Sequence, residues 1–83
     1  MRLESEQIKI DGIYVPAKQR KTLNEETVEA LAEDIMENGQ QQPILVRWDG
    51  ERFILVEGLH RLEACRALGE DTINGLRVQA RMR

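Results

Sequence analysis

Between Ile8 and Val15, apolar residues alternate with polar ones, as in a β-strand that buries one face. The dipeptide Asp11-Gly12 interrupts the alternation, which is typical of a β-bulge or a bend. Pro16 follows, and proline cannot donate to a β-ladder. The pattern therefore predicts a single strand over residues 8–15 with a bulge or bend in its middle.

The next apolar residues are spaced by three and four positions, which is the stripe of an amphipathic helix. They are Val28, Leu31, Ala32 and Ile35. Thr22 with Glu25 fits a capping box, and Asn24 is an equally good N-cap, so the sequence allows two positions for the start of this helix. Gly39 is the expected stop. We interpret the acidic residues of this helix mostly as its solvated face: Glu25, Glu26, Glu29, Glu33, Asp34 and Glu37.

The second half of the chain predicts a hairpin, a helix and a last strand. Residues 44–48 and 52–56 read as two strands, and Asp49-Gly50 between them is a strong hairpin signal. Residues 59–68 read as a helix with one apolar face and Gly69 as its stop, and a strand follows near 73–79. The apolar face consists of Leu62, Cys65 and Leu68. The order β-α-β-β-α-β predicts an α/β (α+β) fold, a small mixed sheet with two main helices.

The composition is that of one folded domain over residues 1–83, with its core at about 8–79. Hydrophobic residues make up 41% and charged residues 33% of the chain, which excludes a disordered tail. The net charge of -3 argues against non-specific DNA binding through an overall basic surface. The single cysteine, the absence of a signal-like start and the lack of a long apolar run predict a cytoplasmic protein without a membrane span.

The most informative stretch is Phe53–Arg61, where an apolar strand runs through Gly58 directly into a helix. The first N–H groups of a helix have no intrahelical partner, and the helix dipole adds partial positive charge there. Glycine allows close approach of a ligand, while His60 and Arg61 add a titratable donor and a permanent cation. This combination predicts a phosphate site. In the alternative reading, Gly58 only makes a tight turn and the two side chains pair with Glu57 or Glu63.

Several segments, in the same order along the chain, resemble the N-terminal domain of ParB in the ParB/sulfiredoxin superfamily. Gln42-Pro43-Ile44, followed by two strands and then by residues 58–64, carries the resemblance. Residues 15–20 look like the Asn-Pro-x-Gln-Pro-Arg segment of that family, and residues 31–39 look like its Leu-Ala-x-Ser-Ile-x-x-x-Gly helix end. The resemblance covers nearly the whole chain from Ile8 to Val78.

The resemblance implies a nucleotide-binding fold, with CTP bound in ParB proteins and ATP in sulfiredoxins. Carried over by position, the phosphate ligands would be Gly58, His60 and Arg61, with Arg20 as a weaker second cation. The segment like Gly39 to Pro43, with Gln42, would line the same pocket. Asp34 stands where the family usually has a hydroxyl residue, and its carboxylate would repel phosphate unless Mg²⁺ or Arg61 intervened.

The departures from the family pattern bear on the chemistry. Leu59 and His60 replace the Glu and the first Arg of the ParB sequence Gly-Glu-Arg-Arg, and Glu63 stands where ParB often has another Arg. Leu59 also stands where sulfiredoxin has its reactive cysteine, so we do not expect reductase chemistry. Cys65 does not substitute for it, because a buried thiol is usually inert. Residues 57–61 look closest to the Asp-Gly-His-His-Arg form of free-standing ParB-like proteins, some of which are nucleotide-dependent kinases.

Three functions remain open at this point. The first is a nucleotide-binding module that regulates a partner protein or a DNA-associated assembly. The second is an enzyme at the same site, a hydrolase, a kinase or the nuclease of the family label "ParB-like nuclease", with Glu57 and Asp34 as the only acids to nominate and no metal site that we can assign. The third is a degenerate domain that acts through protein contacts.

Contacts with DNA and with other protein chains are also open. Two basic clusters could touch DNA phosphates. One consists of Lys18, Arg20 and Lys21, and the other of Arg77, Arg81 and Arg83. ParB proper continues into a helix-turn-helix region and a dimerisation domain, so we do not expect this chain to be a complete partition protein. A homodimer is compatible with the sequence.

Overall fold

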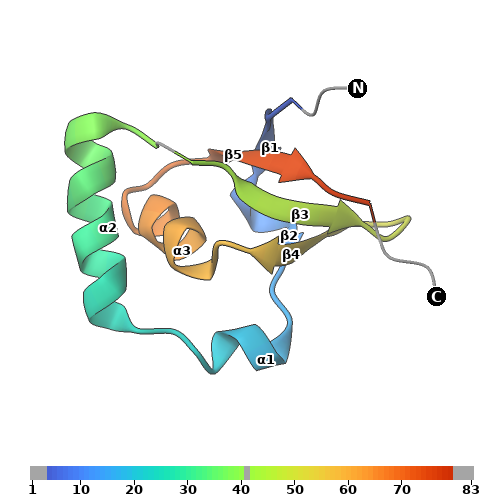
Figure 1. The fold of residues 1–83 in the computed structure, drawn as a ribbon, viewed down its shortest axis with the longest axis horizontal. Coiled ribbons are helices and arrows are strands. Elements are labelled where there is room, and N and C mark those ends of the chain that lie inside the picture. The colour runs from blue at the N-terminus through green and yellow to red at the C-terminus, as the bar shows by residue number, and fades with distance from the viewer. Residues whose placement is uncertain (1–3, 41, 80–83) are drawn as a thin grey trace.

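The computed structural model describes residues 4–40 and 42–79, which form a five-stranded mixed sheet with helices beside it (Figure 1). The elements are β1 (Glu6–Lys9), a 3₁₀ turn (Ile10–Gly12), β2 (Ile13–Tyr14), α1 (Ala17–Arg20), α2 (Glu25–Asn38), β3 (Ile44–Trp48), β4 (Phe53–Glu57), α3 (Leu59–Ala67) and β5 (Thr72–Arg77). The strand order is β1-β5-β3-β4-β2. The β1–β5 and β3–β4 pairs are antiparallel, while β3–β5 and β2–β4 are parallel, which confirms the predicted mixed α/β fold.

The predicted strand over residues 8–15 is in fact two strands at opposite edges of the sheet. A 3₁₀ turn over Ile10–Gly12 separates β1 from β2, and the Ile10 N–H donates to the Asp71 carbonyl at 3.0 Å. The prediction of a single strand with a bulge or bend was therefore wrong. The apolar residues still follow one pattern across the 3₁₀ turn, because all of them pack into the same core. They are Ile8, Ile10, Ile13 and Val15.

The core lies between the sheet and α3. Leu62 of α3 is fully buried, and Leu59 and Cys65 of the same helix join it in the central cluster. Leu68, which the pattern also placed on this face, is only half-buried. The hairpin is confirmed, because the β3–β4 pair brings Trp48 opposite Phe53.

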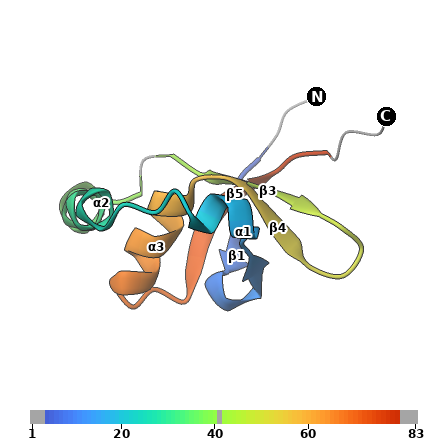
Figure 2. The same ribbon diagram turned by 90° about the horizontal axis from the view of Figure 1, so that it is seen from below.

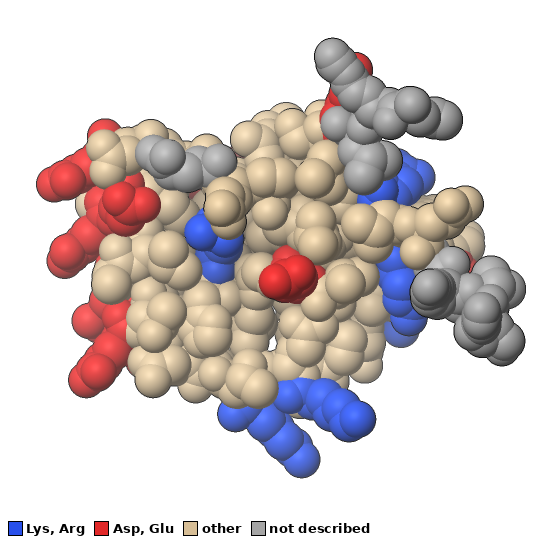
Figure 3. Space-filling model, in the orientation of Figure 1, with Lys and Arg blue, Asp and Glu red and all other residues tan. Residues whose placement is uncertain are grey.

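The helix α2 packs on α3 rather than on the sheet, at the outer edge of the molecule (Figures 1 and 2). Its apolar stripe is consequently half-buried, and no residue of α2 is fully buried. Its acidic side chains are all exposed, and Figure 3 shows acidic groups gathered along the edge that α2 forms. The interpretation of the acidic run as a solvated face is confirmed.

The start of α2 is set by Asn24. The Thr27 N–H donates to Asn24 Oδ1 at 3.0 Å, whereas the Thr22 hydroxyl donates to the Gln19 carbonyl. Asn24 is thus the N-cap, and Gly39, at φ 79°, is the C-cap as predicted. The short helix α1 was not predicted.

Replacing the N-cap side chain should weaken the fold measurably. We expect Asn24→Ala to lower the free energy of unfolding by about 1 kcal/mol, because the Thr27 N–H loses its partner. Urea denaturation monitored by circular dichroism measures the change. Thr22→Ala is the control and should cost less, because the Thr22 hydroxyl donates to the Gln19 carbonyl and caps no N–H group of α2. An equal loss in both variants would contradict this assignment of the cap.

The Cys65 thiol lies in the core with 3% of its surface exposed, and burial raises its pKa above the ordinary value. We expect native protein to react with an aromatic disulfide reagent far more slowly than protein in concentrated urea. Because the folded-state pKa is raised, folding holds the thiol neutral, and stability should fall as the pH rises above the unfolded thiol pKa of about 8.5. Cys65→Ala should lose this alkaline slope. Fast native labelling would contradict the assignment.

Candidate functional site

The turn between β4 and α3 depends on Gly58. Its φ of 114° is a conformation that side-chain-bearing residues rarely adopt. A Cβ placed there would lie 2.6 Å from Ile44 Cγ2 and 3.2 Å from Ile44 Cα, so the backbone of the turn packs directly on the first residue of β3. This contact brings the segment ahead of β3, with Gln42 and Pro43, up to the first turn of α3.

Five of the residues predicted for the site line one hollow at this turn, which we call the Arg61 hollow. Its volume is about 360 Å³. The hollow is lined by Gln42, Pro43, Leu45, Glu57, Gly58, Arg61 and Leu76. In the described part of the chain, no ion pair joins Arg61 to Glu57 or Glu63, and Glu63 pairs with Arg66 at 3.4 Å instead. The Arg61 guanidinium therefore has no carboxylate partner of its own in that part of the chain.

His60 points toward the start of α2 rather than into the Arg61 hollow. The Asn24 N–H donates to His60 Nε2 at 3.0 Å. A ring nitrogen that accepts a hydrogen bond carries no proton, so Nδ1 is the ring nitrogen that remains to donate. The hydrogen bond holds the first turn of α2 against the first turn of α3.

Two helix N-termini consequently meet at one place. The first intrahelical bonds are Val28 N–H to the Asn24 carbonyl in α2 and Leu62 N–H to the Gly58 carbonyl in α3. Apart from the capped Thr27 N–H, the N–H groups ahead of these bonds lie outside the helical ladders. Both dipoles present partial positive charge there, which favours an anion.

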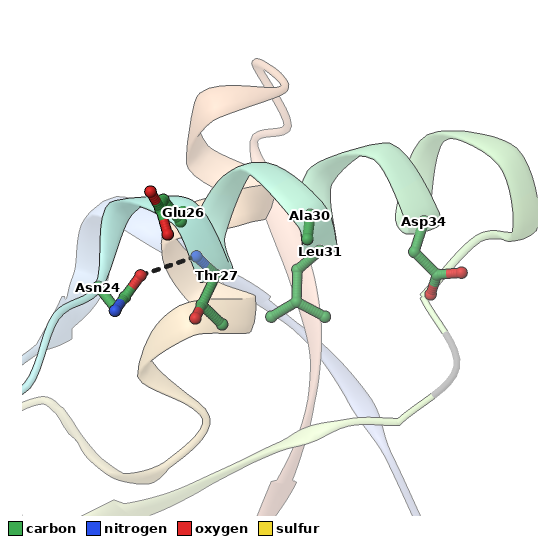
Figure 4. Close-up of a pocket in the computed structure, with 6 residues that line it drawn as sticks. All are labelled: Asn24, Glu26, Thr27, Ala30, Leu31 and Asp34. Atoms are coloured by element: carbon green, nitrogen blue, oxygen red, sulfur yellow. Dashed lines mark hydrogen bonds between the residues drawn. The ribbon is translucent and has the colours of Figure 1, made fainter.

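A second hollow runs along α2, and we call it the α2 hollow (Figure 4). All of its lining residues belong to α2 or to its N-cap, so this hollow is an open face of one helix and not an enclosed pocket. The lining residues are Asn24, Glu26, Thr27, Ala30, Leu31 and Asp34. Asp34 Oδ1 accepts from Asn38 Nδ2 at 2.9 Å. The two nominated acids thus line different hollows, since Glu57 belongs to the Arg61 hollow.

Two other predicted residues lie elsewhere. Arg20 lines a third hollow, of about 300 Å³, together with Leu59, Glu63 and Arg66, and its Nε donates to the Val15 carbonyl at 3.2 Å. Gly39 ends α2 and starts the segment toward Gln42. The structure therefore gathers Gly58, Arg61, Gln42 and Pro43, sets His60 at the junction of the two helices, and leaves Arg20 in a separate hollow.

Sequence reasoning missed the role of Gln40. Its Oε1 accepts from the Asn74 N–H at 2.9 Å, and its Nε2 donates to the carbonyls of Asn74, at 3.0 Å, and Gln42, at 2.8 Å. The side chain thus continues the pairing of β5 beyond the start of β3 and holds Gln42 in place. Nothing in the sequence distinguishes Gln40 from its glutamine neighbours, so no local signal could have found it.

Gln19 was missed as well. Its Nε2 donates to the Leu55 carbonyl at 2.8 Å and fixes α1 against the end of β4. Within residues 4–40 and 42–79, no three metal-binding side chains cluster. No helix in those residues is long and apolar enough to cross a membrane.

Residues 2–82 match the model of the family described as the ParB N-terminal domain. A probable chromosome-partitioning protein ParB from Campylobacter jejuni is 41% identical over 71 residues, which is 84% of this chain and 26% of the relative. The corresponding protein from Helicobacter pylori is 37% identical over 63 residues, 76% of this chain and 22% of the relative. The chain spans about a quarter of the length of these curated relatives.

Solved structures share the fold. Sulfiredoxin from Arabidopsis thaliana matches with a TM-score of 0.84 and 25% identity, over 93% of this chain and 86% of that one. The C-terminally truncated ParB from Caulobacter crescentus, complexed with CTP-γ-S, matches with a TM-score of 0.81 and 29% identity, over 94% of this chain and 46% of that one. A free serine kinase in complex with AMP has a TM-score of 0.79 at 20% identity, over 94% of this chain and 32% of that one, a likeness of fold alone.

Proposed function

Since this chain belongs to the ParB N-terminal domain family, we propose that it is a nucleotide-binding module for CTP or ATP. The phosphates lie at the first turn of α3, on the amides after Gly58, the Nδ1–H of His60 and the guanidinium of Arg61. The segment Gly39–Pro43 borders the same site. The module regulates a partner protein or a DNA-associated assembly.

The observation that carries this proposal is the hydrogen bond from the Asn24 N–H to His60 Nε2 at 3.0 Å. Because it joins the starts of α2 and α3, the free amides and positive dipole ends of two helices converge beside one imidazole. The adjacent Arg61 hollow supplies a guanidinium without a carboxylate partner among the described residues. Such an arrangement suits a multiply charged anion, and the CTP-γ-S complex of the Caulobacter ParB supports a nucleotide as the source of that anion.

A nucleotide titration tests the proposal. The protein is titrated with CTP, ATP and ADP, with and without Mg²⁺, while its backbone amide signals are followed by heteronuclear NMR. We expect shifts at residues 58–61, at Gly39 and Gln42, and at the start of α2. Unchanged spectra at millimolar nucleotide would reject the proposal. Product formation in the same samples separates a binding module from a hydrolase or kinase.

A scaffold that has lost its ligand is the second candidate. It is favoured by the fact that the Gly58 conformation and its packing on Ile44 explain this glycine without any ligand. The His60 hydrogen bond likewise has a structural use, because it joins α2 to α3. The titration decides between the two candidates, since a scaffold gives no nucleotide-dependent shifts.

The setting of the module is proposed from its relatives, which are probable chromosome-partitioning proteins. We place it in the cytoplasm beside DNA, where it is held by a DNA-binding partner protein or contacts the DNA directly. It would act there as a single chain or as a homodimer. Direct contact would use the exposed Lys18 and Lys21, since Arg77 already pairs with Glu6 at 3.2 Å, and Arg81 and Arg83 lie outside the described residues. A gel shift that weakens steeply with added salt would support direct contact.

A further inference from the structure

The end of the sheet that lies away from α2 carries every aromatic side chain of the protein, since the chain contains one Trp, one Tyr and one Phe. Trp48, the last residue of β3, lies opposite Phe53, the first residue of β4, with ring centroids 5.0 Å apart in an edge-to-face arrangement. Tyr14 of β2 lies opposite Ile54, the residue after Phe53, so its side chain is on the other face of the sheet. Trp48 is 45% exposed and Tyr14 is 38% exposed. Two large aromatic groups are therefore open to solvent at one end of the molecule.

Arginine side chains stack on two of these rings. The guanidinium carbon of Arg52 lies 4.0 Å from the centroid of the Tyr14 ring, and that of Arg77 lies 4.9 Å from the centroid of the Phe53 ring. A stacked guanidinium is held in place by the ring, while its N–H groups stay available at the edge of the plane. Trp, Tyr and Arg are also the residue types that contribute most to protein–protein association. We call this surface the hairpin end, and it consists of Tyr14, Arg47, Trp48, Arg52, Phe53 and Arg77.

The charges of the hairpin end are balanced. Its three arginines are accompanied by three carboxylates, which are Glu6, Asp49 and Glu51. Two of the arginines have a carboxylate partner within the chain, at 3.2 Å for Arg77 and 3.8 Å for Arg52. Neither Arg47 nor Glu51 forms an ion pair in the residues that the structure describes. A surface without net charge is poorly suited to nucleic acid, whose binding depends on neutralising phosphates. It suits a second copy of itself, because Arg47 of each copy can then face Glu51 of the other.

The charge of α2 decides how two copies can approach each other. Its 14 residues include six carboxylates and no Lys or Arg, and the whole chain has a net charge of -3. Two copies therefore repel each other wherever their α2 helices come close. The hairpin end and α2 lie at opposite ends of the longest dimension of the molecule, which is 38 Å (Figures 1 and 3). A contact between two hairpin ends keeps the α2 helices much farther apart than the Debye length of about 8 Å at physiological salt, so their repulsion is largely screened.

We infer that two copies of this chain associate through their hairpin ends, in an isologous dimer with twofold symmetry. Trp48 of each copy lies at the centre of the contact, as aromatic anchors do in other interfaces, and Arg47 of each copy faces Glu51 of the other. The inference rests on the homodimer named in the proposed function, but it uses no residue of the nucleotide site. Because the hairpin end is small, we expect a weak dimer that forms at micromolar to millimolar protein.

The wild-type protein provides the first test, because the fluorescence of its single tryptophan reports directly on the contact. Sedimentation equilibrium and acrylamide quenching are measured over the same range of protein concentration, without nucleotide. We expect the mean mass to rise toward that of two chains, and the quenching of Trp48 to fall in parallel, because the ring leaves water on association. A single-stranded oligonucleotide that quenches Trp48 in monomeric protein would overturn the inference in favour of nucleic acid.

Charge exchange provides the second test. Glu51→Arg should weaken the dimer, because it places a cation opposite Arg47 of the other copy. Combining Glu51→Arg with Arg47→Glu should restore association, because the two charges are exchanged and opposite signs face each other again. Trp48→Ala should weaken association by at least about 30-fold, the effect of an interface hot spot. Circular dichroism shows whether this variant folds, and if it does not, the charge exchange decides.

Met36→Ala is the matched control. It removes a large side chain that is 69% exposed, but from α2, so association should stay at the wild-type level. The inference would be overturned by a wild type that stays monomeric, by a dimer that Trp48→Ala or Glu51→Arg leaves unchanged, or by assemblies that keep growing beyond two chains. None of these outcomes changes the nucleotide titration, whose failure would reject the nucleotide site and leave the dimer intact.

Discussion

Gly58→Ala should lower the free energy of unfolding by about 2–6 kcal/mol, the largest stability change that we expect from a single substitution in the site. A φ of 114° costs a side-chain-bearing residue about 1–3 kcal/mol. The added methyl would also meet Ile44 Cγ2 at 2.6 Å, and overpacking of this kind costs about 1–3 kcal/mol. Since a whole domain is stable by only about 5–15 kcal/mol, we expect the variant to lose a large part of its stability. Urea denaturation measures the difference.

Gly12→Ala is the control for this prediction. Nothing lies within 4 Å of a Cβ at Gly12, and its φ is not positive, so we expect a change within about 0.5 kcal/mol. A double-mutant cycle of Gly58→Ala with Ile44→Ala tests the contact with Ile44 Cγ2. Removing this atom relieves the closest contact, while Ile44 Cβ and Cα stay 3.0 and 3.2 Å away, so the double variant should be more stable than the sum of the single losses predicts. Additive losses would mean that the contact with Cγ2 does not contribute to the destabilisation.

Arg61→Ala should weaken nucleotide binding by about 10- to 150-fold, since a charge-assisted contact to phosphate contributes about 1.5–3 kcal/mol. Its effect on stability should be small, because no carboxylate among the described residues pairs with Arg61. His60→Ala should also destabilise the fold, because the imidazole accepts from the Asn24 N–H in addition to its proposed contact with phosphate. We expect this second variant to lose both affinity and about 1 kcal/mol of stability. Calorimetry and urea denaturation on the same samples separate the two effects.

Arg66→Ala serves as the charge control. It removes one arginine from the same helix, but Arg66 pairs with Asp11 and Glu63 and lies outside the Arg61 hollow. Nucleotide affinity should therefore stay close to the wild-type value. Equal weakening by Arg61→Ala and Arg66→Ala would mean that the ligand responds only to net charge, and would contradict a phosphate contact at Arg61. Together, His60→Ala and Arg61→Ala should abolish binding.

The parts of the fold that local chemistry decides could be predicted from the sequence. Asp49-Gly50 specifies the hairpin, because Asp49 Oδ1 accepts from the N–H groups of Glu51 and Arg52. Gly39 ends α2. The change from strand to helix at Gly58 is predicted by the residues directly before and after this glycine. Each of these signals is contained within a few positions of the chain.

Features that depend on distant partners could not be predicted. The apolar alternation over residues 8–15 is the same whether one strand or two enter the core, and only the sheet order separates β1 from β2. The orientation of His60 follows from the position of Asn24, a residue of another helix. The role of Gln40 follows from Asn74, a residue of the last strand. The residues that line the Arg61 hollow were therefore easier to predict than the direction in which the His60 side chain points.

The pairing of β1 with β5 also determines when this domain can finish folding. Glu6 lies opposite Gly75 and Lys9 opposite Thr72, and among the strands of the described residues β1 pairs only with β5. On the ribosome, β1 emerges before β5 and must wait, without its partner strand, until β5 has been synthesised. Such distant pairing slows folding, and an unpaired edge invites contacts with other chains. The hairpin and α3 can form earlier, so closure of this edge should be the step most exposed to misassembly during synthesis.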